Sequence, residues 1–105
     1  MTELNLERCR YLRTKYPNCY PIILKASDES QNLNKCKLLV PKDSSVSNFM
    51  SQIRHHNKLN SKDAYFLFVN NILINTSENI ENIYIQHKSQ NGFLYITVKK
   101  ESTFG

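Results

Sequence analysis

FLYITV, residues Phe93–Val98, is a continuous run of apolar and β-branched residues near the end of the chain, and the other elements are placed around it. The run follows Asn91-Gly92, a pair that is typical of turns, so it is predicted to be a β-strand entered through a turn. Apolar continuity without alternation favours a strand that is buried on both faces. The run therefore predicts a strand in the middle of a sheet.

The residues after this run have a different character. Lys99–Thr103 are mostly polar, and they are followed by Phe104 and a final Gly105. A short polar end is typical of a frayed terminus. The same end suits a carboxylate that is presented for covalent activation, because glycine has no Cβ and its backbone can enter a narrow channel. The tail alone leaves both interpretations open.

Length and composition predict one globular domain. The chain has 105 residues, of which 40% are hydrophobic and 22% are charged, and no apolar run reaches the roughly 20 residues of a membrane span. The charged N-terminus predicts no export signal, so the cysteines, Cys9, Cys19 and Cys36, are expected to be reduced thiols in the cytosol. The net charge of +5 indicates acidic partners: anionic lipid, acidic peptide or nucleic acid.

Hydrophobic periodicity predicts a helix over Leu4–Tyr16, which Pro17 ends, and a second helix that Ser45 caps. Pro21 predicts that the first strand lies at a sheet edge or enters irregularly. The further predicted elements are strands at Tyr20–Lys25, Lys35–Val40, Tyr65–Val69 and Ile72–Ile74, a turn at Asn70-Asn71, and helices at Ser45–Asn57 and Asn79–His87. After the first helix the order is ββαββαβ, which predicts an α+β fold: a ubiquitin-like β-grasp with one added N-terminal helix.

Catalytic and metal sites are not predicted. His55 and His56 point about 100° apart on a helix, and His87 is alone on another, so they cannot share a metal ion. No nucleophile signature surrounds any cysteine, and two glycines are too few for a phosphate-binding loop. We therefore expect a protein that is not an enzyme and that needs no cofactor. No nucleic-acid recognition motif is present, and no nucleic acid is expected as a partner.

Several short motifs occur together in a specific order, and they cover nearly the whole chain from Arg8 onward. The motifs are Lys15-Tyr16-Pro17 with Pro21, Lys37-Leu38-Leu39-Val40-Pro41, Ile53-Arg54, Phe66-Leu67-Phe68-Val69-Asn70-Asn71, and Phe93-Leu94-Tyr95-Ile96 with a tail ending in Phe104-Gly105. In these motifs the chain resembles the autophagy ubiquitin-like modifiers, the family of GABARAP and the microtubule-associated-protein light chains.

The resemblance implies a function and its partners. Members of this family are activated at a C-terminal glycine by an E1-like enzyme, passed to an E2-like enzyme, and joined to phosphatidylethanolamine on autophagosomal membranes. A cysteine protease trims many of them. The implied location is the cytoplasm, and the autophagosome membrane after lipidation. The implied domains are a helical extension (1–18), a ubiquitin-like domain (19–98) and a flexible conjugation tail (99–105).

The resemblance also implies site residues. Gly105 matches the conjugated glycine, and Phe104 matches the aromatic residue before it. Receptors of the family carry an aromatic-x-x-aliphatic motif, which is read by two pockets beside the strand that contains Lys37. The aromatic pocket would comprise Leu12, Pro21, Ile23, Lys37, Leu39 and Phe93. The aliphatic pocket would comprise Leu38, Val40, Pro41, Val46, Phe49 and Ile53, with Arg54 and Lys37 as the basic residues that meet acidic residues of the motif.

The chain departs from the family pattern at several points. Its N-terminus has room for about one helix where the family usually has two, and Cys19 replaces a residue that is usually basic. Ser44 and Gln52 stand where the aliphatic pocket usually has leucines, so a shallower pocket is expected. Two alternatives stay open: the related modifier that is conjugated to a protein lysine, and a basic binding module without conjugation.

Overall fold

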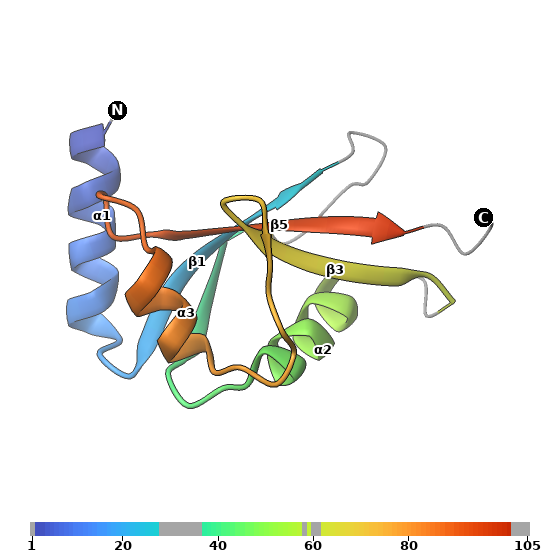
Figure 1. Ribbon diagram of the computed structural model, residues 1–105. Helices are drawn as coiled ribbons and strands as arrows, with labels where there is room; N and C mark the ends of the chain where they lie inside the picture. Colours follow the sequence, from blue (N-terminus) through green and yellow to red (C-terminus); the bar gives the residue numbers. More distant parts are fainter. Residues whose placement is uncertain (1, 28–36, 58, 60–61, 102–105) are drawn as a thin grey trace.

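The computed structural model describes residues 2–27, 37–57, 59 and 62–101, and its elements have the predicted order. Figure 1 shows their arrangement. The helices and strands are α1 (Thr2–Lys15), β1 (Cys19–Ala26), β2 (Lys37–Pro41), α2 (Val46–Asn57), β3 (Ala64–Val69), β4 (Ile72–Leu73), α3 (Ile80–His87) and β5 (Leu94–Glu101). Lys35 and Cys36, which were predicted to begin the second strand, lie outside the described residues.

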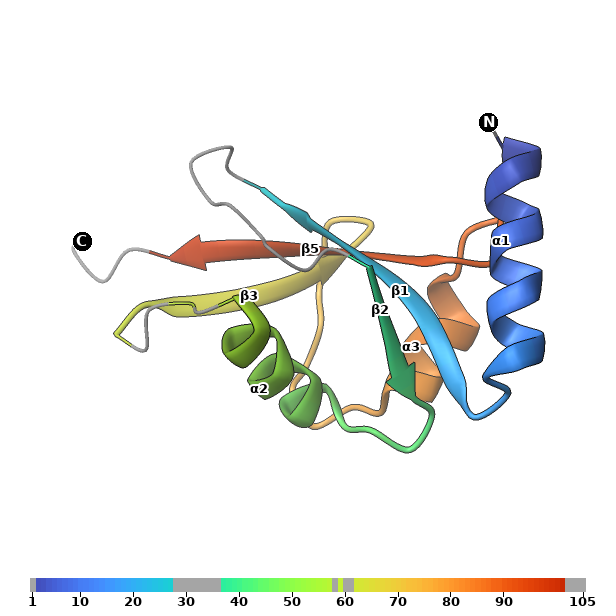
Figure 2. The same cartoon turned by 180° about the vertical axis from the view of Figure 1, so that it is seen from behind.

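The strands form one mixed sheet in the order β2-β1-β5-β3-β4. β5 runs parallel to β1, with Ile22 opposite Leu94, whereas its other neighbour, β3, is antiparallel to it. Figures 1 and 2 show α2 and α3 on the same side of the sheet and α1 across the end where β1 and β5 begin. This arrangement confirms the predicted α+β β-grasp with one N-terminal helix.

β5 lies in the centre of the sheet, as predicted, but its two faces differ. Leu94, Ile96 and Val98 have no exposed side-chain surface, whereas Tyr95 and Thr97 are half-buried. The prediction of burial on both faces was therefore wrong for the face opposite α2 and α3. α2 and α3 cover the face of Leu94, Ile96 and Val98, whereas on the opposite face only Phe93, next to α1, is buried at 5% exposure. An apolar run can therefore form a central strand that is covered on both faces at its start alone.

β5 is also longer than predicted. Lys99–Glu101 belong to the strand and pair with Ala64–Phe66 of β3, so the prediction of a flexible tail from residue 99 was wrong for these three residues. Their side chains are exposed, and the strand continues because ladder pairing uses the backbone rather than apolar side chains. Residues 102–105 lie outside the described residues.

The core forms between the sheet and the apolar face of α2. Val46, Phe49 and Ile53 of this helix are at most 1% exposed and belong to one cluster with side chains from β1, β2, β3 and β5. Ser45 caps the helix as predicted, because its Oγ accepts a hydrogen bond of 3.0 Å from the Asn48 N–H. None of the described helices is both long enough and apolar enough to cross a bilayer.

Two local predictions have different outcomes. Asn70 and Asn71 have φ angles of 51° and 66°, so the predicted turn between β3 and β4 is confirmed. Pro21 does not mark an edge strand, since β1 lies between β2 and β5. Pairing of β1 with β5 begins only at Ile22. Pro21, which has no backbone N–H, therefore lies before the first residue pair of that ladder.

Candidate functional site

A cavity of about 280 Å³ lies between α1 and the β1–β2 pair. Its wall is built from α1, from β1, from β2 and from the residue that leads into β5. We call it the α1–β2 cavity, and its lining residues are Arg8, Leu12, Pro21, Ile22, Ile23, Lys37, Leu38, Leu39 and Phe93. All six residues predicted for the aromatic pocket are in this set. The structure thus brings them together in one hollow.

The register of the sheet explains why these side chains share one surface. Pro21 pairs with Leu39, and Ile23 pairs with Lys37, so the four side chains project from the same face of two adjacent strands. Leu39 is 36% exposed, and Lys37 is also exposed. The floor of the cavity is therefore fixed by strand pairing, and its rim is accessible.

β2 is an edge strand of the described sheet, because only β1 pairs with it. An edge strand presents backbone N–H and C=O groups that another extended chain can pair with. A peptide that added to this edge would run along the α1–β2 cavity and could place alternate side chains in it. Figure 2 shows β2 beside β1 on this side of the molecule.

α1 packs closely against the rest of the domain at two places, of which the first is the contact between Cys9 and Gly92. Cys9 is 3% exposed, and a Cβ placed on Gly92 would lie only 2.5 Å from its Sγ atom. Gly92 also has a φ of 90°, a conformation that side chains disfavour. The φ angle and the contact with Cys9 are two independent reasons for a glycine at this position. The predicted turn before β5 is thus also a surface on which α1 packs.

A second contact holds α1 one turn further along. The rings of Tyr20 and Tyr84 are stacked with centroids 4.0 Å apart, and the Arg13 guanidinium lies 5.3 Å from each centroid. Arg13 also donates a hydrogen bond of 3.1 Å to the Tyr84 hydroxyl, which in turn donates to the Gly92 carbonyl. Leu12 lies between Cys9 and Arg13 in the sequence, so these contacts fix the cavity wall.

The protonation states of Tyr84 and Cys9 are compatible with these contacts of α1. Burial raises the pKa of the Tyr84 hydroxyl above its ordinary value of 10.0, although Arg13 opposes the shift. Burial likewise raises the pKa of the Cys9 thiol above 9.0. Both groups are therefore neutral at physiological pH, and the Tyr84 hydroxyl keeps the proton that it donates to Gly92.

The residues predicted for the aliphatic pocket do not gather into an open surface. Val40, Val46, Phe49 and Ile53 are at most 1% exposed and belong to the core. Pro41 is exposed, and Leu38, which is half-buried, lines the α1–β2 cavity instead. A ligand would reach the buried side chains only after a movement of α2 relative to β2, so this second pocket stays a prediction.

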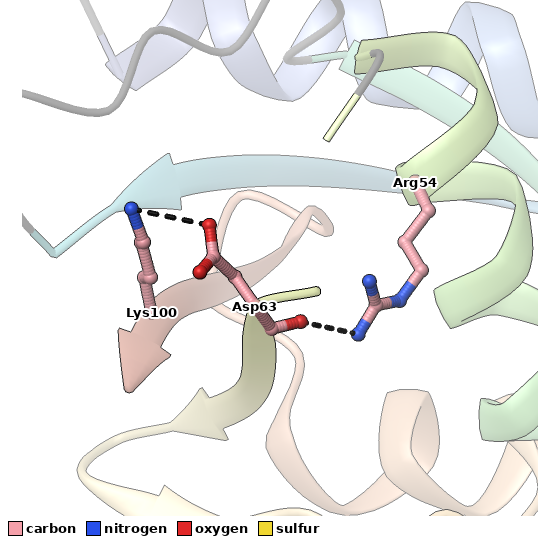
Figure 3. A network of polar contacts seen from close by, with 3 residues as sticks. All are labelled: Arg54, Asp63 and Lys100. Carbon is pink, nitrogen blue, oxygen red and sulfur yellow. Dashed lines mark hydrogen bonds and ion pairs between the residues drawn. The ribbon is translucent and has the colours of Figure 1, made fainter. Parts of the chain in front are cut away.

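Arg54 lies in a different environment from Lys37. Figure 3 shows it in a network with Asp63 and Lys100, at the start of β3 and near the end of β5. Arg54 donates a hydrogen bond of 3.2 Å to the Asp63 carbonyl, and the Asp63 carboxylate pairs with Lys100 at 3.2 Å. Arg54 does not line the α1–β2 cavity. The network joins α2, β3 and β5, and a role of Arg54 in peptide binding stays a prediction.

Three lining residues were not predicted for the aromatic pocket: Arg8, Ile22 and Leu38. Arg8 precedes Leu12 by four positions, a spacing that puts two side chains on the same helix face, so the sequence held the signal that would have found it. Gly105 and Phe104 lie outside the described residues. Among the described residues, no three histidine, cysteine or acidic side chains are grouped so as to hold a metal ion.

Comparison with known proteins identifies the family. The model of the family described as "Autophagy protein Atg8 ubiquitin like" matches residues 5–105. This chain belongs to the Atg8 family. Autophagy-related protein 8e of Arabidopsis thaliana is 42% identical over 96 residues, which cover 90% of this chain and 79% of that protein. Autophagy-related protein 8 of Schizosaccharomyces pombe is 43% identical, with the same coverage. The predicted resemblance is thereby confirmed.

Solved structures of Atg8 proteins have the same fold. The crystal structure of Trypanosoma brucei ATG8 aligns with a TM-score of 0.91 and 31% identity, over 100% of this chain and 92% of that one. Plasmodium falciparum Atg8, in complex with a Plasmodium falciparum Atg3 peptide, aligns with a TM-score of 0.82 and 27% identity, over 92% and 88% of the two chains. The chain is therefore an autophagy-related ubiquitin-like protein.

Proposed function

We propose that this Atg8-family protein is a modifier rather than an enzyme. Its C-terminal Gly105 would be joined to phosphatidylethanolamine on autophagosomal membranes, and its surface would recruit receptors that carry an aromatic-x-x-aliphatic motif. It would be cytoplasmic before conjugation and membrane-bound afterwards. The observation that carries the proposal is the α1–β2 cavity, in which all six residues expected for the aromatic pocket meet beside the edge strand β2.

Receptor binding follows from the chemistry of that surface. An extended peptide would pair with the outer edge of β2, and these backbone hydrogen bonds would give affinity without regard to sequence. Insertion of an aromatic side chain into the cavity would supply specificity, since buried aromatic anchors contribute most of the energy of such interfaces. Lys37 at the rim favours acidic residues next to the anchor, mainly through faster association.

Conjugation would take place at the other end of the molecule. Figure 1 shows β5 running from α1 toward the opposite end, and the strand ends at Glu101. Gly105 is four residues further on, which limits its distance from the strand end to roughly 14 Å. Conjugation enzymes would act on the tail while the α1–β2 cavity stays open to a receptor. The partners we propose are the E1-like and E2-like enzymes, a trimming cysteine protease and the receptor peptides.

The Plasmodium falciparum complex supports the E2-like partner, because its Atg8 holds a peptide of Atg3. Similarity to that protein extends over 92% of this chain. We therefore infer that an E2-like enzyme docks on this protein through a short peptide segment as well as through the tail.

The central experiment compares the unchanged protein with Gly105→Ala. Both are incubated with the E1-like and E2-like enzymes, ATP and vesicles that contain phosphatidylethanolamine, and the products are weighed by mass spectrometry. The added Cβ should block conjugation because the activating channel admits a bare backbone only. Ser102→Ala serves as the matched control and should be lipidated normally.

Three results would redirect the proposal. Normal lipidation of Gly105→Ala would show that the glycine is not the conjugated residue. An isopeptide adduct on a protein lysine, formed in place of the lipid adduct, would identify the other type of autophagy modifier. Steeply salt-dependent binding to nucleic acid, unaffected by loss of Gly105, would instead favour a basic binding module.

A further inference from the structure

The polar side chains on the wall of the α1–β2 cavity are all hydrogen-bond donors. Arg8 enters from α1 and Lys37 from β2, and the remaining seven lining residues are apolar. Arginine and lysine side chains can only donate, because neither has a lone pair that accepts a hydrogen bond at neutral pH. The cavity therefore offers cations at its rim and no side chain that can accept a hydrogen bond from a ligand.

Both cations are available to a ligand. Arg8 and Lys37 are exposed, and neither forms an ion pair or hydrogen bond with any described side chain. Arg8 lies one helical turn before Leu12, which is held by the contacts of Cys9 and Arg13 on either side of it. The guanidinium is thus attached to a positioned segment of α1 and is directed to one side of the cavity.

These donors distinguish among the three aromatic side chains that fit the proposed motif. The hydroxyl of tyrosine can accept a hydrogen bond, phenylalanine has no polar group, and the indole of tryptophan has an N–H that can only donate. An indole N–H placed beside these donors finds no side chain that accepts its proton, and its access to water at the partly solvated rim is reduced, which is unfavourable. The backbone carbonyls at the edge of β2 do not relieve this, because the added peptide strand uses them.

We propose that Arg8 and Lys37 make this site select tyrosine over tryptophan as the aromatic anchor of its partner peptides. The proposal rests on the proposed function, since it concerns the anchor of the same receptor peptides. Arg8 is the residue that determines the selectivity, and Lys37 supports it from the opposite wall.

The test is a set of three acidic peptides that differ only in the aromatic residue: tyrosine, phenylalanine or tryptophan, each with leucine three positions later. Dissociation constants are measured by calorimetry at one salt concentration. Tyrosine should bind about fivefold more tightly than tryptophan, as expected for one hydrogen bond to a charged donor at a partly solvated rim.

The second arm repeats the measurements with Arg8→Glu. A carboxylate accepts the indole N–H, so the preference for tyrosine over tryptophan should fall by about tenfold relative to the unchanged protein. Arg10→Glu is the matched control, because Arg10 is exposed on the same helix and does not line the cavity. It reverses the charge in the same way and should weaken the binding of all three peptides equally.

The outcomes separate this inference from the proposed function. If all three peptides bind and tryptophan is preferred, the inference is wrong and the receptor site stands; that order would result if Arg8 lay over the ring face, since cation–π attraction is strongest for tryptophan. If Arg8→Glu and Arg10→Glu change the ranking equally, Arg8 does not determine it. If no peptide binds, both the receptor site and its selectivity are overturned.

Discussion

The α1–β2 cavity and the apolar face of α2 were assigned the same kind of role, yet they differ in what their side chains do. The cavity leaves Leu39 36% exposed, whereas Phe49 and Ile53 on α2 have no exposed surface. Both regions are rich in apolar residues. The cavity is a hollow that exists before a ligand arrives, and the α2 face is packed into the core that holds the sheet together.

The difference shows how to separate binding from stability in this fold. Shortening an exposed residue at the rim of the cavity, such as Leu39, should change the stability of the free protein little, because water already reaches its side chain. A residue in the packed core leaves a void that the surroundings fill only in part. Substitutions in the two regions should therefore change different measured quantities.

The largest expected effect is the loss of stability caused by a substitution in the core, on the apolar face of α2. Phe49→Ala should lower the free energy of unfolding by about 3–5 kcal/mol, because the side chain is fully buried. Leu39→Ala is the matched variant in the cavity and should cost less than about 1 kcal/mol while weakening peptide binding. Chemical denaturation measures both. A loss below about 1 kcal/mol for Phe49→Ala would place that side chain outside the core.

The second prediction concerns the peptide. Replacing its aromatic residue with alanine should cost about 2 kcal/mol or more of binding free energy, because the α1–β2 cavity is preformed. Replacing the aliphatic residue should cost less, since the side chains predicted to receive it are buried in the core. Calorimetry with the peptide and its two variants checks the ranking. Equal losses would mean that the α2 face opens for ligands as readily as the cavity does.

The third prediction addresses the contact between Gly92 and Cys9, which holds α1 as one wall of the cavity. Gly92→Ala should destabilise the protein by about 1–3 kcal/mol, from the positive φ angle and from contact with Cys9 Sγ. Adding Cys9→Ala to Gly92→Ala should restore only the stability that is lost through contact with the Cys9 Sγ atom. The loss from the positive φ angle should remain. Gln90→Ala, at an exposed position of the same connection, is the control for denaturation and peptide binding. Full recovery in the double variant would show that the φ angle costs nothing.

The smallest effect is expected from pH. The pKa of the Cys9 thiol and that of the Tyr84 hydroxyl are raised in the folded protein above their ordinary values of 9.0 and 10.0. The folded state therefore holds these protons more tightly than the unfolded state does. The stability they contribute is complete below pH 9 and is lost as the pH rises through these values toward the folded ones.

Urea titrations at pH 7, 9 and 10 measure this loss. Cys9→Ala should remove the part of the loss that begins near pH 9 and leave the part that begins near pH 10, to which Tyr84 and Tyr20 both contribute because burial raises the pKa of each hydroxyl. A stability that rises between pH 7 and 10 would contradict the direction of both shifts. The affinity for the peptide should not change with pH near neutrality on account of Cys9 or Tyr84, because neither group titrates there.

The order of elements could be predicted because local signals agree with one another in this sequence. Ser45 caps α2, Asn70-Asn71 turns the chain between β3 and β4, and the run Leu94–Val98 forms the central strand. The two errors in β5 have different causes. The apolar run does not show how far helices cover each face of the strand, which is why Tyr95 and Thr97 are only half-buried. Sequence patterns report side-chain polarity, whereas the ladder that carries Lys99–Glu101 along β3 is made by the backbone.

The site was predictable to a different degree. Motif resemblance found six lining residues of the cavity but could not distinguish a hollow from a packed face, since both require the same residue types. Arg8 was missed because a single cation on a charged helix has no distinctive pattern, although its spacing from Leu12 was visible. The role of Arg8 depends on the position of α1, which is set by contacts with Gly92 and Tyr84, far from Arg8 in the sequence.

The parallel pairing of β1 with β5 has a consequence for synthesis on the ribosome. Ile22 of β1 pairs with Leu94 of β5, which is translated much later. β1 therefore lacks its partner in the centre of the sheet until β5 has been synthesised. A nascent chain that stops short of Leu94 lacks the strand that joins the two halves of the sheet, and it also lacks the residues that would be conjugated. Under the proposed function, a product truncated before Leu94 would lack both the central strand and Gly105, so it could neither complete the sheet nor be conjugated.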